Sequence, residues 1–76
     1  MKNNVVQSTP DILSGMPVFR GTRVPIKNLF DYLESDDTIE NFLGDFPTVH
    51  REQVIEVLAL AEHALTSPET IHENIT

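Results

Sequence analysis

The chain has 76 residues and no cysteine, and this combination limits the folds that are open to it. A chain of this length forms one domain, and it buries only roughly 60–65% of the surface that its unfolded form exposes. Neither a disulfide nor a thiolate zinc site is available to stabilise so small a core. Burial of apolar side chains must therefore hold the fold, and a second subunit would enlarge a core that is marginal in one chain.

The charged residues are unevenly distributed along the chain. The formal net charge is −7, from 12 acidic and 5 basic residues, which argues against a general binder of nucleic acid or anionic membranes, because phosphate contacts need Lys and Arg. Four of the basic residues lie in residues 1–30, whereas eleven of the acidic residues lie in residues 31–76. This asymmetry predicts two surfaces with different partners. Alternatively, the two parts pair with each other, within one subunit or across a dimer.

Residues 1–25 are typical of a short β and turn arm. Two valines at residues 5–6 predict an edge strand. Two further β-prone pieces, residues 18–19 and 22–24, flank Gly21. Glycine adopts positive φ without a steric penalty, so a tight hairpin or bulge is expected at that position.

The rest of the chain predicts three helices, of which the first two are short. Apolar residues recur at i, i+3, i+4 and i+7 from Ile26 onward, which predicts a helix over residues 26–35. A second helix is expected over residues 38–43, with Asp37 as its N-cap and Gly44 just past its end.

A longer third helix is expected over residues 49–65, with Thr48 as its N-cap. The element order predicts one mainly α domain, in which residues 26–66 form a three-helix, helix-turn-helix bundle behind the β arm. Residues 67–76 are expected to form a tail or a short terminal helix.

The apolar arc on the third helix is wider than one core contact requires. The face expected to meet the core carries Val54, Leu58, Ala61 and Leu65. Val57, Leu60 and Ala64 extend the apolar arc to about 220°, whereas a core-facing helix needs roughly 100° or a little more. We therefore predict a homodimer, or a contact with another partner, through these three residues.

The last two helices have the order of a helix-turn-helix, in which the second helix presents its first residues to the major groove. Arg and Gln are suited to read guanine and adenine by paired hydrogen bonds, and clustered cations in the arm are suited to hold phosphate. The candidate DNA-contacting residues are Arg20, Arg23, Lys27, Thr48, His50, Arg51 and Gln53.

The same segments also fit a bundle with no role in DNA binding. Glu52 and Glu56 lie on the third helix and Asp45 lies in the turn, where carboxylates would be repelled by phosphate. Arg20 and Arg23 are equally suited to ion pairs with acidic residues of the second and third helices.

Catalysis and cofactor binding have little support in the sequence. Glu52, Glu56 and His63 fall within about 40° on the third helix, but carboxylates on a solvated face produce the same pattern, so we predict no metal and no cofactor. We expect a protein that is not an enzyme, because no nucleophile–base pair or phosphate loop is present.

The longest apolar run, residues 57–61, is far shorter than the roughly 20 residues of a membrane span. No apolar leader opens the chain, and we expect a cytoplasmic protein that does not bind membranes.

Residues 12–25 read Ile-Leu-Ser-Gly-Met-Pro-Val-Phe-Arg-Gly-Thr-Arg-Val-Pro. This segment resembles the opening signature of the bacterial family called domain of unknown function 433, in which Arg-Gly-Thr-Arg lies between two prolines. Asp-Phe-Pro at residues 45–47 is similar to the connector of that family, and the resemblance covers about residues 8–65. The matching signature residues that we expect to define the fold are Gly15, Pro17, Gly21, Thr22 and Pro25; Arg20 and Arg23 complete the match.

The resemblance implies a helix-turn-helix domain of winged-helix or homeodomain-like type with a short β element in front. It also implies a VapB-type antitoxin that neutralises a PIN-like nuclease toxin and binds operator DNA. The sequence departs from related antitoxins at one point, because no Lys or Arg follows Arg51, and their tails commonly place a basic residue in the nuclease site. The alternative is a dimeric protein-interaction domain with no DNA-binding role.

Overall fold

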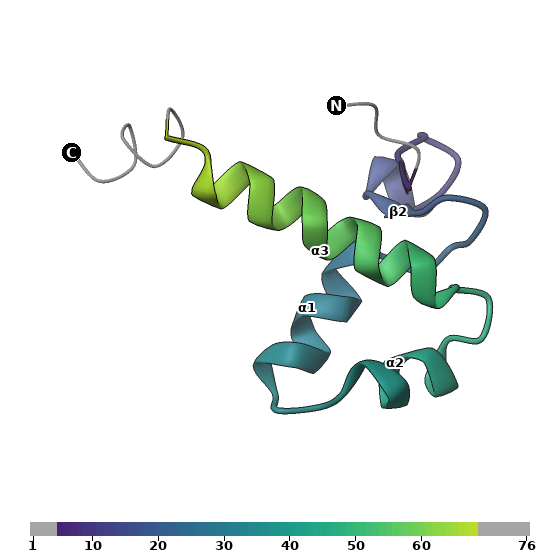
Figure 1. Ribbon diagram of the computed structural model, residues 1–76. Helices are drawn as coiled ribbons and strands as arrows, with labels where there is room; N and C mark the ends of the chain where they lie inside the picture. Colours follow the sequence, from purple (N-terminus) through teal and green to yellow (C-terminus); the bar gives the residue numbers. More distant parts are fainter. Residues whose placement is uncertain (1–4, 69–76) are drawn as a thin grey trace.

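The computed structural model describes residues 5–68, and it is mainly helical with a two-stranded antiparallel sheet in front (Figure 1). The elements in chain order are β1 (Val6–Gln7), the 3-10 turn η1 (Leu13–Gly15), β2 (Val18–Phe19), α1 (Ile26–Glu34), α2 (Ile39–Asp45) and α3 (Arg51–Thr66). This confirms the predicted fold class. The predicted tail or terminal helix lies mostly outside the described residues.

The arm contains the predicted edge strand, but the hairpin is built differently from the expectation. β1 pairs with β2 in the register Val6 opposite Phe19, so the first strand, and not residues 22–24, forms the sheet with β2. On the other side of β2, the Phe19 amide donates to the Val24 carbonyl at 3.0 Å, and a single bridge joins Val18 to Pro25. The turn between them passes through Gly21 at a φ of 80°, as expected.

The second helix begins one residue later than predicted, and its cap is Thr38. The Thr38 hydroxyl accepts from the Asn41 amide at 3.0 Å. Asp37 is not the cap, because its carboxylate accepts from the Asn41 side chain at 2.6 Å and from the Thr38 amide at 2.9 Å; these bonds lower the pKa of Asp37. Gly44 lies inside the helix and does not end it.

The third helix begins at Arg51, with His50 and not Thr48 as its N-cap. The Val49 amide donates to the Phe46 carbonyl at 3.0 Å, and Val49 is buried. This turn occupies the segment where the helix was expected to start. The Gln53 side chain then accepts from the His50 amide at 2.9 Å, which is one half of a capping box.

The core is centred on Phe42, which is fully buried. Its ring contacts Phe19 of β2, Tyr32 of α1 and Phe46 of the connector, with centroid separations of 5.8, 5.4 and 5.1 Å. The remaining buried members of the cluster are Val5, Leu29, Val49, Val54 and Val57. One aromatic side chain of α2 therefore joins the arm, the first helix and the turn before α3.

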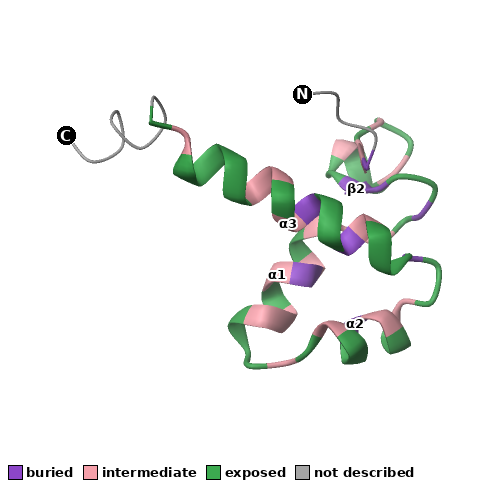
Figure 2. Ribbon diagram, in the orientation of Figure 1, coloured by how far each residue is buried: buried purple, intermediate pink, exposed green. Residues whose placement is uncertain are grey.

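The buried residues of α3 all lie in its first half, as the colours of Figure 2 show. Val57, predicted as a partner contact, is 4% exposed and belongs to the core of the single chain. Leu60 packs against the core from a half-buried position, and Ala64 is exposed. Leu65, expected to face the core, is 61% exposed, because α3 extends past the elements that would cover it (Figure 1).

We expect Phe42→Ala to lower the free energy of unfolding by about 3–5 kcal/mol, because a fully buried ring leaves a cavity that the core cannot refill. Urea unfolding followed by circular dichroism measures this change. Ile55→Ala is the matched control: Ile55 is 57% exposed on α3, and its truncation is expected to change stability by no more than about 0.5 kcal/mol. Equal losses in the two variants would contradict the core described above.

Candidate functional site

The loop over residues 20–23 of the arm is held between β1 and the start of α3. The Gln53 side chain donates to the Arg20 carbonyl at 3.0 Å across 33 residues of sequence. On the other side, the Gly21 amide donates to the Gln7 side chain at 3.1 Å. The two groups of predicted DNA-contacting residues, one in the arm and one at the start of α3, are therefore neighbours in the fold.

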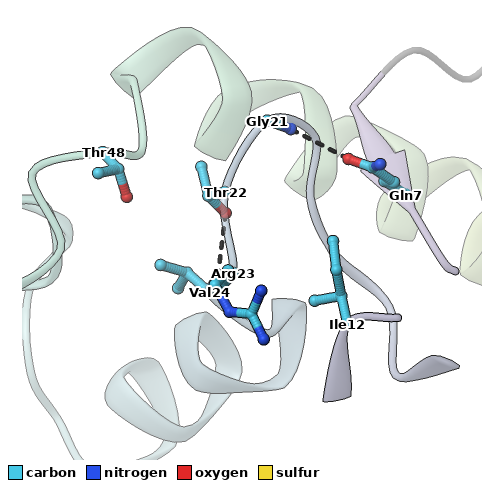
Figure 3. A pocket seen from close by; sticks show the side chains of 7 residues that line it. All are labelled: Gln7, Ile12, Gly21, Thr22, Arg23, Val24 and Thr48. Carbon is cyan, nitrogen blue, oxygen red and sulfur yellow. Dashed lines mark hydrogen bonds between the residues drawn. The ribbon is translucent and has the colours of Figure 1, made fainter. Parts of the chain in front are cut away.

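A surface pocket of about 530 Å³ lies at this junction (Figure 3). Its lining residues are Gln7, Ile12, Gly21, Thr22, Arg23, Val24 and Thr48. Thr48 comes from the turn before α3, whereas Arg23 and its neighbours come from the loop. Gln7 and Ile12 were not among the sequence candidates, since their position depends on the pairing of β1 with β2, which no local pattern reveals.

The cations of the site differ in how they are engaged. Arg23 is exposed and forms no ion pair with any residue between 5 and 68. The Arg20 guanidinium donates to the Val6 carbonyl at 3.3 Å. Arg51 pairs with Glu40 at 3.1 Å on the surface. The pKa of Glu40 is lowered first by a backbone hydrogen bond at Glu40 itself and then by its hydrogen bond with Arg51.

Lys27 is not brought together with these residues. It donates to Asp31 at 2.8 Å within α1, and this hydrogen bond raises the pKa of Lys27. It lines a second pocket, beside Pro17 and Ile26, in which none of the other predicted DNA contacts takes part.

His50 and Gln53 have structural roles that the sequence did not reveal. His50 caps α3, and both polar atoms of the Gln53 amide are engaged, with the His50 amide and the Arg20 carbonyl. These bonds hold the Gln53 side chain in place, with one further N–H and one further lone pair left on the amide. Arg20, Arg23, Thr48 and Arg51 are the other candidates in the loop and around the start of α3.

The outward face at the start of α3 is acidic. Glu52 and Glu56 are exposed there, with Ile55 between them at 57% exposure. Asp45 was counted with these acids, but it accepts a hydrogen bond from the Tyr32 hydroxyl and so ties the end of α2 to α1; this bond raises the pKa of Tyr32.

The signature residues make the contacts that shape the loop. Thr22 is 8% exposed, and its hydroxyl donates to the Phe19 carbonyl at 2.8 Å and accepts from the Val24 amide at 3.0 Å. Gly15 has a φ of 91° at the end of the 3-10 turn. The Pro17 carbonyl accepts from the Ile26 amide at 3.0 Å, which brings the start of α1 against the arm.

Neither a metal-ligand cluster nor a membrane-spanning helix occurs among residues 5–68. No three His, Asp or Glu side chains in this part of the chain gather as metal ligands. None of the helices described has the length and apolar character that crossing a membrane requires.

Comparisons with known proteins give a family and one relative. The model of a family described as "Protein of unknown function (DUF433)" matches residues 6–61. An uncharacterized protein y4eO of Sinorhizobium fredii is 38% identical over 50 residues, which is 66% of this chain and 23% of that protein. The chain therefore matches less than a quarter of the length of this relative. No solved structure matches the chain.

We expect Thr22→Val to lower the free energy of unfolding by about 1–3 kcal/mol, because the half-buried Val24 amide loses its hydrogen-bond partner. Thr22→Ser is the matched control, since it keeps the hydroxyl and removes only a methyl group, and we expect it to cost about 1 kcal/mol or less. Chemical denaturation of the two variants makes the comparison. A valine variant as stable as the serine variant would show that the hydroxyl has no such role.

Proposed function

Because the chain belongs to the DUF433 family, we propose that it is a small antitoxin-like DNA-binding regulator that pairs with a PIN-like nuclease toxin in the cytoplasm. The observation that carries the DNA-binding half is the junction between the arm and α3. There the Gln53 side chain bonds the Arg20 carbonyl, and Arg23 and Thr48 line one pocket. The antitoxin half rests on the resemblance of the signature at residues 12–25 to that of antitoxin-like proteins.

In this proposal the protein contacts mainly the phosphate backbone. Arg23 has no internal ion pair among the described residues, and the ion pair of Arg51 is on the surface and is readily exchanged for a phosphate. His50 and Gln53 position the loop and the helix. Phosphate contacts fix orientation but carry little sequence information.

Two copies of the chain are part of the proposal. One chain offers few cations at the junction, and Glu52 and Glu56 lie nearby. A dimer doubles the phosphate contacts, and helix-turn-helix dimers bind half-sites that are separated by about one turn of DNA. Affinity built in this way falls steeply with salt, because each contact releases a counterion.

A second candidate function is a protein-interaction domain with no DNA-binding role. The exposed group Glu52, Ile55 and Glu56 favours it, because two carboxylates around an apolar side chain on the second helix of the pair suit a cationic protein surface better than phosphate. The same surface supports pairing with a toxin through contacts other than a basic tail, since no Lys or Arg follows Arg51.

We expect Arg23→Gln to weaken binding to the DNA upstream of its own gene by roughly three- to tenfold and to lower the slope of log affinity against log salt by about 1 per bound copy. Fluorescence anisotropy with labelled duplex at several salt concentrations measures both. Arg23→Lys keeps the positive charge at the same position and should leave the salt slope nearly unchanged. If the wild-type protein shows no binding at low salt, the DNA-binding half is lost and the second candidate stands.

Pairing with a toxin is tested in cells. If the gene beside that of this protein encodes a short PIN-like nuclease, its expression alone should arrest growth, and coexpression of the present chain should relieve the arrest. Glu52→Lys combined with Glu56→Lys reverses the acidic surface and should abolish relief while leaving the protein folded, as judged by circular dichroism. Relief that survives this change would place the toxin contact elsewhere.

A further inference from the structure

The last turns of α3 present an apolar side chain that the other residues of the described range, 5–68, leave exposed. Val54 and Leu65 lie on the same face of α3, eleven residues apart. Val54 is fully buried, whereas Leu65 is 61% exposed. Figure 1 shows the reason, because the end of α3 extends away from the arm, α1 and α2. The core-facing stripe of the helix therefore continues into solvent.

A separate apolar pocket of about 330 Å³ lies between the arm and the start of α1. Its lining residues are Val6, Met16, Pro17, Ile26 and Lys27. Met16 is 43% exposed, so the pocket opens to solvent beside an apolar side chain. No residue of α3 lines it, and it shares no residue with the pocket at the arm–α3 junction.

The charges at the two surfaces are complementary. Among the described residues, Lys27 is the one charged residue that lines the pocket. Its side chain is 72% exposed, and its ion pair with Asp31 lies on the surface, where it is readily exchanged for another carboxylate. Glu62 is exposed on α3 and lies three residues before Leu65, on the same side of the helix. The end of α3 thus offers an apolar side chain next to a carboxylate, and the pocket offers apolar walls next to an ammonium.

We propose that the pocket at the start of α1 receives the end of α3 from a second copy of this chain, with Leu65 in the pocket and Glu62 beside Lys27. A two-fold axis makes the contact reciprocal and closes the assembly as a dimer. Val57 is buried in its own chain, so this interface replaces the stripe predicted through Val57, Leu60 and Ala64. The inference rests on the dimer in the proposed function and leaves the arm–α3 junction open for DNA.

Sedimentation equilibrium tests which surface of α3 holds the copies together. The wild-type chain should show twice the 8.6 kDa mass of one chain, and Leu65→Glu should raise the dimer dissociation constant on the order of tenfold or more. Ile55→Glu is the matched control, because Ile55 is similarly exposed on α3 (57% against 61%) but lies outside this stripe; its dimer should persist. Circular dichroism checks that both variants fold.

A disulfide test identifies the contact directly, because the chain has no cysteine of its own. Met16→Cys protein mixed with Leu65→Cys protein should form a heterodimeric disulfide under mild oxidation, whereas Met16→Cys mixed with Ile55→Cys should not. Lys27→Glu and Glu62→Lys should each weaken the dimer, and the two changes together should restore it.

The outcomes separate the interface from the dimer itself. A wild-type mass of one chain at all concentrations would overturn both. A wild-type dimer that Leu65→Glu leaves intact, with no disulfide between positions 16 and 65, would overturn this interface and leave the proposed dimer standing. DNA binding is measured independently by anisotropy, so its loss or survival does not decide this contact.

Discussion

Burial of Phe42 is the interaction on which the rest of the structure depends. The Phe42 ring meets Phe19 from the arm, Tyr32 from α1 and Phe46 from the connector. The chain has no cysteine and few buried side chains, and no other residue between 5 and 68 contacts so many aromatic rings. The arm is therefore part of the core, and the position of the Arg20–Arg23 loop follows from the packing of the aromatic cluster.

The junction between the arm and α3 then depends on one amide. Gln53 bonds the His50 amide with its oxygen and the Arg20 carbonyl with its nitrogen, so the start of the helix and the path of the loop are linked through a single side chain. Arg23 and Thr48 reach the same pocket as a result. The charge asymmetry of the sequence thus corresponds to a cationic junction beside an acidic helix face.

Periodicity predicted the three helices well, because apolar spacing reports directly on which face is buried. The predicted N-caps of the second and third helices were wrong. At the second, Asp37 and Thr38 are both good capping residues, and the choice depends on the bond between Asp37 and the Asn41 side chain. The site was harder to predict, because side-chain contacts also decide the roles of its residues. Glutamine is a residue type suited to reading a base, so Gln53 was a candidate DNA contact. Its partner Arg20 is 33 residues away, and local patterns carry no information on such contacts. Val57 likewise lies at the flank of the core stripe, and its burial depends on neighbours that a helical projection does not contain.

The extension of α3 past the core also affects how firmly its last turns are folded. Residues near Leu65 have few neighbours other than their own helix, so their local opening costs far less free energy than unfolding of the whole chain. Backbone amides there should exchange with solvent long before those around Val54. Any partner that covers this end would slow that exchange, and part of its binding energy would be used to order the helix.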